Sequence, residues 1–171
     1  MTGRRAFAGL ALVALAAGGY FWLRPTDESK IRAQLAKLAE TVRVKESDGQ
    51  ANPLLRYSRI NDAFTGLFEE DVRVSIPELT SLQAGRAPLV ELATSAPRFV
   101  RMLDVDLGSI TVKLDETATS AAVGATANLS AVERDGEKRS DRRAIDARFV
   151  KRDGAWIVAT LTVWDKADAR P

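Results

Sequence analysis

The chain has 171 residues, with 25 basic and 23 acidic side chains and neither cysteine nor histidine. The missing cysteine excludes disulfides and thiolate metal sites, and the missing histidine removes the commonest general base and transition-metal ligand. Residues 1–24 hold three of the basic residues and none of the acidic ones, so the remainder is near neutral and lacks the basic bias of many nucleic-acid-binding domains. We expect no nucleic-acid partner, metal or cofactor.

The N-terminal segment has the pattern of a membrane anchor. Arg4 and Arg5 precede an uncharged apolar run over residues 6–23, which ends with Tyr20 and Trp22. Such a run is just long enough to cross a bilayer, and amphipathic aromatic side chains favour the headgroup level. The arginine pair predicts a cytoplasmic N-terminus. We therefore expect a single-pass protein of the bacterial inner membrane, with its domain in the periplasm or outside the cell.

Two other interpretations of this segment stay open. The small residues of "ALAAG" (14–18) also suit signal peptidase, which would remove the segment after export. A buried helix of a soluble protein is the third possibility. The expected organisation is an N-terminal anchor or uncleaved signal sequence at 1–25 and a single domain at 26–171.

The first part of the domain predicts three helices and one short strand. Helices are expected over 27–45, from Pro53 to near Glu70, and over 85–96, because apolar residues recur at helical spacing. The alternating "VRVSI" (72–76) predicts a strand. Glu69, Glu70 and Asp71 would then form a solvated corner between the second helix and this strand.

The second part predicts four antiparallel strands, near 99–114, 119–132, 144–150 and 155–164. Asp-Gly pairs at 135–136 and 153–154 are typical of hairpin turns. In the first of these strands, apolar residues occupy odd-numbered positions before Gly108 and even-numbered positions after it. One extra residue at Gly108 would return them to a common face, which predicts a β-bulge there. The result is an α+β domain, with three helices packed on a curved, mainly antiparallel sheet.

Two stretches resemble the nuclear transport factor 2-like superfamily, which includes ketosteroid isomerases and SnoaL-like cyclases. They are "LFEEDVRVSIPEL" (67–79) and "FVKRDGAWIVATLTVW" (149–164), and the resemblance covers about residues 27–166. It implies a cone-shaped pocket between helices and sheet, and a homodimer through the sheet face.

The resemblance argues against the chemistry of the isomerases. Their general base is an Asp directly before the Pro of the short strand, and the matching residue here is Ile76. Their oxyanion-stabilising Tyr lies on the first helix, which has no Tyr here. We expect a membrane-tethered binding or assembly module without catalysis, serving an envelope protein partner or an apolar small molecule.

The alternative is an isomerase, cyclase or dehydratase acting on a small carbonyl compound. Its candidate catalytic residues are Tyr57, Asp62 and Asp104. For Asp104 and Asp106 we also weigh pairing with Arg143 or Arg148 across the sheet. The residues expected to line a ligand or partner pocket are Tyr57, Phe64, Trp156 and Trp164. Tyr57 is expected on the apolar face of the second helix, and the two tryptophans on one face of the last strand.

Overall fold

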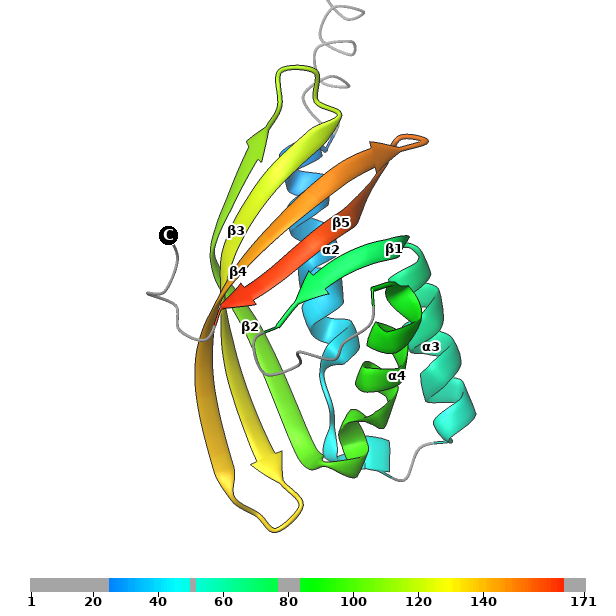
Figure 1. The fold of residues 1–171 in the computed structure, drawn as a ribbon. Helices are drawn as coiled ribbons and strands as arrows, with labels where there is room; N and C mark the ends of the chain where they lie inside the picture. The colour runs from blue at the N-terminus through cyan, green and yellow to red at the C-terminus, as the bar shows by residue number, and fades with distance from the viewer. Residues whose placement is uncertain (1–24, 50–51, 77–83, 165–171) are drawn as a thin grey trace, which may run out of the picture.

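The computed structural model describes residues 25–49, 52–76 and 84–164. Within these ranges, three helices lie on the concave face of one curved sheet (Figure 1). The helices are α2 (Asp27–Val42), α3 (Pro53–Thr65) and α4 (Arg86–Ser95), with the short 3₁₀ turns η1 (Glu46–Gly49) and η2 (Ala96–Arg98). The strands are β1 (Phe68–Ser75), β2 (Val100–Leu114), β3 (Ser120–Glu133), β4 (Lys138–Arg152) and β5 (Ala155–Trp164). The α+β prediction is confirmed.

The sheet has the order β1-β5-β4-β3-β2. Strands β2 to β5 are antiparallel neighbours, as predicted, whereas β1 pairs with β5 in parallel. The last strand therefore lies between the first strand and β4. This arrangement leaves β1 and β2 as the two edges of the sheet.

Helix α3 is shorter than the sequence pattern predicts. It ends at Thr65, where the Gly66 N–H bonds to the Asp62 carbonyl oxygen. The apolar residues that follow belong to β1, in which Phe68 pairs with Val158 of β5. Consequently the three acids at 69–71 lie within a strand, and the predicted helix–strand corner there is wrong.

The bulge predicted near Gly108 is present. The pairing of β2 with β3 shifts register between Gly108 and Thr111, and Ser109 has a φ of 50°. The extra residue lets Leu107 and Ile110 both pack against the core. The long strand thus keeps an apolar inner face on both sides of the bulge.

The N-terminus of α2 is joined to the β4–β5 hairpin. Lys151 Nζ lies 2.8 Å from Asp27 Oδ2 and 5.3 Å from the ring centre of Trp156, which is fully buried. Lys151 lowers the pKa of Asp27 to about 2, chiefly through this hydrogen bond. The pair fixes the start of the first described helix against the end of the sheet.

Within the described residues, none of the helices combines the length and apolar character needed to cross a bilayer. The anchor expected at 6–23 lies outside those residues. Its membrane role therefore stays a prediction.

Candidate functional site

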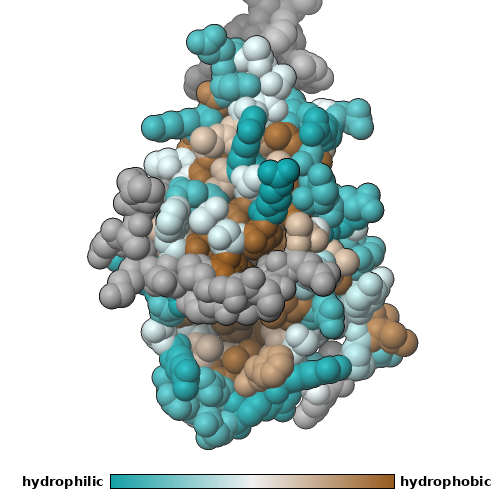
Figure 2. All heavy atoms as spheres, in the orientation of Figure 1, coloured by the Kyte–Doolittle hydropathy of each residue, from teal (hydrophilic) through white to brown (hydrophobic). Residues whose placement is uncertain are grey.

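A cone-shaped cavity of about 470 Å³ lies between the inner face of the sheet and the helices. Figure 2 shows hydrophobic atoms in a hollow that is bordered by hydrophilic surface. Helix α2 contributes Leu35, Leu38, Ala39 and Val42, and α4 contributes Leu89, Leu92 and Ala93. The floor is formed by inward residues of β2 to β5, among them Val105, Val123, Ala125, Ala127, Ile145, Ala147 and Leu161. The cavity falls within the usual size range of small-molecule pockets.

Small side chains on the floor help to leave this space. Ala125, Ala127 and Ala147 occupy inward positions on adjacent strands β3 and β4. Protein interiors are normally close-packed, so a patch of alanine opposite a helix leaves room unless a larger side chain reaches across it. That these alanines lie together follows from the pairing register of β3 with β4, which the sequence alone does not give.

The lining carries very little polarity. Among the described residues that line the cone, Arg143 is the charged one, and its Nε lies 2.5 Å from Asp141 Oδ2. The lining has no carboxylate, hydroxyl or amide side chain within the described part of the chain. A cavity of this composition is suited to holding an apolar molecule.

Ile76 lies in the wall of the cone. By the resemblance described above, this residue matches the position of the general base in the isomerases. Helix α2, which contains no Tyr, presents only apolar residues to the cavity. An isoleucine cannot accept a proton, so this position supplies no base.

Comparison with solved structures identifies the architecture. A candidate aromatic ring hydroxylase from Novosphingobium aromaticivorans has a TM-score of 0.62 at 16% identity, covering 85% of this chain and 90% of that chain. A candidate scytalone dehydratase from the same organism gives 0.61 at 15%, covering 85% and 95%. Hexachlorocyclohexane dehydrochlorinase (LinA) type 2 gives 0.59 at 10%, covering 80% and 83%.

The chain shares the fold of these structures, and this is the fold that the resemblance to the nuclear transport factor 2-like superfamily implies. At these identities the likeness concerns the fold alone. The chain matches no protein-family model, and no functionally described protein in the sequence comparison is significantly similar to it.

The three candidate catalytic residues do not line the cone. Tyr57 is about half exposed on α3, and Asp62 is exposed near the end of the same helix. Asp104 is turned away from the cavity, and its Oδ1 lies 2.6 Å from Arg43 Nε at the end of α2. Its partner is thus Arg43, rather than the Arg143 or Arg148 predicted across the sheet.

The expectation that Tyr57 belongs to the buried face of α3 is also wrong. The buried residues of this helix are Arg56, Ile60 and Phe64, which follow one another at four-residue spacing. Tyr57 projects instead into a groove between α3 and α4. Phe64, in contrast, lines the cone as predicted.

The two tryptophans expected to share one face of β5 lie on opposite faces. Arg148 pairs with Thr160 but the next residue, Phe149, pairs with Val158, so Ala159 is an extra residue in β5. This second bulge turns Trp156 into the core and Trp164 to the outer face, where its indole N–H donates to Asp146. Neither tryptophan lines the cone.

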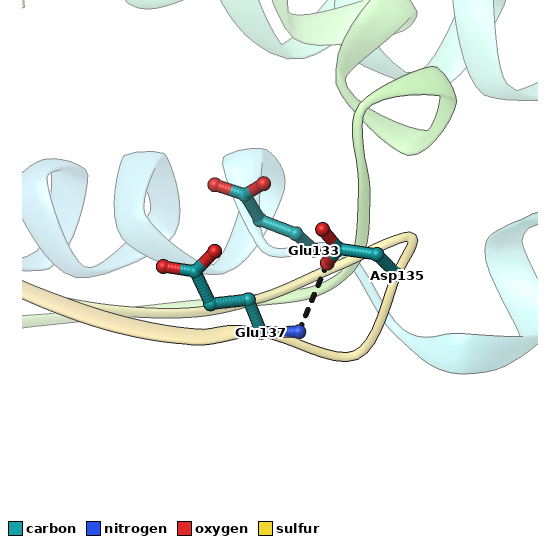
Figure 3. A group of neighbouring side chains, drawn as sticks. All are labelled: Glu133, Asp135 and Glu137. Carbon is teal, nitrogen blue, oxygen red and sulfur yellow. Dashed lines mark hydrogen bonds between the residues drawn. The ribbon is translucent and has the colours of Figure 1, made fainter.

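The β3–β4 turn gathers three acids, Glu133, Asp135 and Glu137 (Figure 3). The Glu137 backbone N–H donates to Asp135 Oδ1, and Arg139 Nε lies 2.7 Å from Glu133 Oε1 and 3.3 Å from Glu137 Oε1. The hydrogen bond to Glu137 raises the pKa of Arg139. We interpret the group as a surface turn that Arg139 stabilises rather than a cation site.

Proposed function

We propose that this protein is a membrane-tethered, extracytoplasmic binding module whose cone holds an apolar small molecule without transforming it. The observation that supports this proposal is the lining of the cone, in which Ile76 stands at the base position and Arg143 is the charged residue. General acid–base chemistry needs a titratable group within hydrogen-bond reach of the substrate. The described lining offers none that exchanges a proton near neutral pH.

The alternative is catalysis on a carbonyl compound, and it draws support from structural neighbours whose names are those of enzymes. It would require Tyr57, Asp62 or Asp104 to act from surfaces outside the cavity. Their positions favour the binding function. An envelope protein partner and a homodimer through the outer face of the sheet remain part of the proposal.

The proposal is tested by photolabelling of the full chain in lipid nanodiscs with an adamantane diazirine, a small uncharged apolar probe. Label is expected on the tryptic peptide that spans residues 114–134 and includes the cone wall of β3. Ala127→Phe fills the cavity with a bulky side chain and should remove most of this label.

Ala122→Phe is the matched control, because it adds the same side chain to the same strand on the exposed outer face. Labelling of this variant should equal that of the wild type. Equal labelling in all three proteins would show that the probe does not enter the cone, and would contradict the proposal.

A further inference from the structure

A second cavity, of about 940 Å³, lies between α3 and α4, and none of the described residues lines both this cavity and the cone. It is a polar groove bordered by η1, η2 and the start of the β3–β4 turn. Four arginines from four separate segments line it: Arg56, Arg86, Arg98 and Arg134. Three of them, Arg56, Arg98 and Arg134, form what we call the arginine end of the groove.

The arginine end is held together at one corner of the fold. Arg56 Nη1 donates to Asp48 Oδ2 over 2.9 Å, while Arg134 Nη2 donates to the carbonyl oxygen of Pro97. A β-carbon at Gly49 would lie 3.6 Å from Arg134 Nη2. Arg56 and Arg134 therefore both reach η1, and Arg98 directly follows Pro97.

The charges at this end are only partly balanced. Asp48 neutralises Arg56, and Arg134 binds a carbonyl group, which carries no net charge. Arg98 has neither a hydrogen bond nor an ion pair from its guanidinium within the described residues, and it is exposed. Glu70 and Glu91 also line the groove without ion-pairing to these arginines.

Two buried polar atoms beside the arginine end have no hydrogen-bond partner among the residues that the structure describes. They are Arg56 Nε and Thr94 Oγ1, and both residues line the groove. They are close neighbours, because Arg56 Nη2 donates to the carbonyl of Ala93, the residue before Thr94. Buried polar groups in native proteins are nearly always paired, so two orphans in one place indicate a missing partner.

We infer that the arginine end binds an oxyanion, the phosphate or carboxylate group of a small-molecule ligand. Guanidinium groups match such groups in geometry as well as in charge, through pairs of parallel N–H donors. Arg98 and Arg134 supply exposed donors, and Thr94 adds a hydroxyl. The remaining length of the groove accommodates the rest of the ligand.

The test uses the full chain, labelled with ¹⁵N-arginine, in nanodiscs of zwitterionic lipid. Inorganic phosphate and acetate are titrated separately at constant ionic strength, and the arginine Nε–H resonances are followed by NMR. The resonances of Arg98 and Arg134 should move saturably with at least one anion. Tighter binding of phosphate would indicate a phosphate group on the ligand, and tighter binding of acetate would indicate a carboxylate.

Arg98→Gln and Thr94→Val should each weaken binding about tenfold, the effect of losing one hydrogen bond to a charged group. Thr94→Val should also raise the melting temperature of the anion-free protein, because it removes an unpaired buried hydroxyl. Arg148→Gln, on the exposed outer face, is the matched control and should bind as the wild type does. Shifts that are absent, or that are equally weakened in Arg148→Gln, would overturn the inference.

Discussion

Asp27 illustrates how a single ion pair links stability to pH. Its pKa of about 2 in the folded chain lies below the roughly 3.9 of an unperturbed Asp. A lowered folded-state pKa means that this carboxylate stabilises the fold above about pH 4. That contribution is lost as the pH falls through about 2, once the carboxylate is protonated in both states.

We therefore predict that the Asp27 carboxyl titrates near pH 2 and that Lys151→Met moves its midpoint upward toward 3.9. The measurement is a ¹³C carboxyl titration by NMR. Between pH 5 and 2, the unfolding free energy of Asp27→Asn should fall less than that of the wild type. If the Asp27 midpoint stayed near pH 2 in Lys151→Met, a group other than Lys151 would be responsible for the lowered pKa.

Residues 56 and 57 show where sequence reasoning failed at this scale. The pattern of polar and apolar residues assigns Tyr57 to the buried face and Arg56 to the surface. In the structure Arg56 is buried and Tyr57 is about half exposed. Arg56 is tolerated inside because Asp48 and the Ala93 carbonyl satisfy its terminal nitrogens. Neither partner is detectable by helical spacing, since one precedes the helix and the other lies on α4.

At the scale of elements, the sequence predicted the three helices, the five strands and the first bulge, although α3 ends earlier, and β1 and β4 begin earlier, than expected. The bulge at Gly108 could be predicted because the apolar residues shift from odd-numbered to even-numbered positions across it. The bulge at Ala159 was not, because the threonines at 160 and 162 fit either face of a strand. Its position depends on pairing with β4, which periodicity within one strand does not report.

The first bulge gives a prediction for β2. Ser109 has a φ of 50°, a left-handed conformation that is unfavourable for β-branched residues. Ser109→Val should destabilise the chain by about 1–2 kcal/mol, whereas Ser109→Gly should be neutral or stabilising. Urea unfolding followed by tryptophan fluorescence measures both.

The matched control for this substitution is Ser130→Val, at an exposed position of β3. It should change stability by less than about 0.5 kcal/mol, because valine is favourable in regular strands. A loss as large as that of Ser109→Val would mean that the effect does not come from the bulge.

At the scale of the whole molecule, the anchor that we propose would decide where the cone works. We predict that alkaline phosphatase fused after Thr26 is active in bacteria, because the enzyme folds only outside the cytoplasm. Replacing Arg4 and Arg5 by Glu should reduce this activity, since positive residues hold the N-terminus inside. Colony colour and enzyme assay report the topology.

The mass of the intact protein separates the two exported forms. A retained anchor keeps residues 1–24, whereas signal peptidase would remove most of them. Inactive fusions would contradict export itself. Unchanged activity in the Glu variant would contradict the orientation argument.

The position of β5 between β1 and β4 has a consequence for how the chain folds. Among the strands that the structure describes, β1 forms ladder pairs only with β5, whose residues lie about 90 positions further along the chain. Such distant pairing is slow to form. During synthesis the apolar faces of α2 and α3 cannot be covered fully until the last strand emerges. A chain that stops before residue 155 would lack the strand that joins β1 to β4, so β1 could not be added to the β2–β3–β4 part of the sheet.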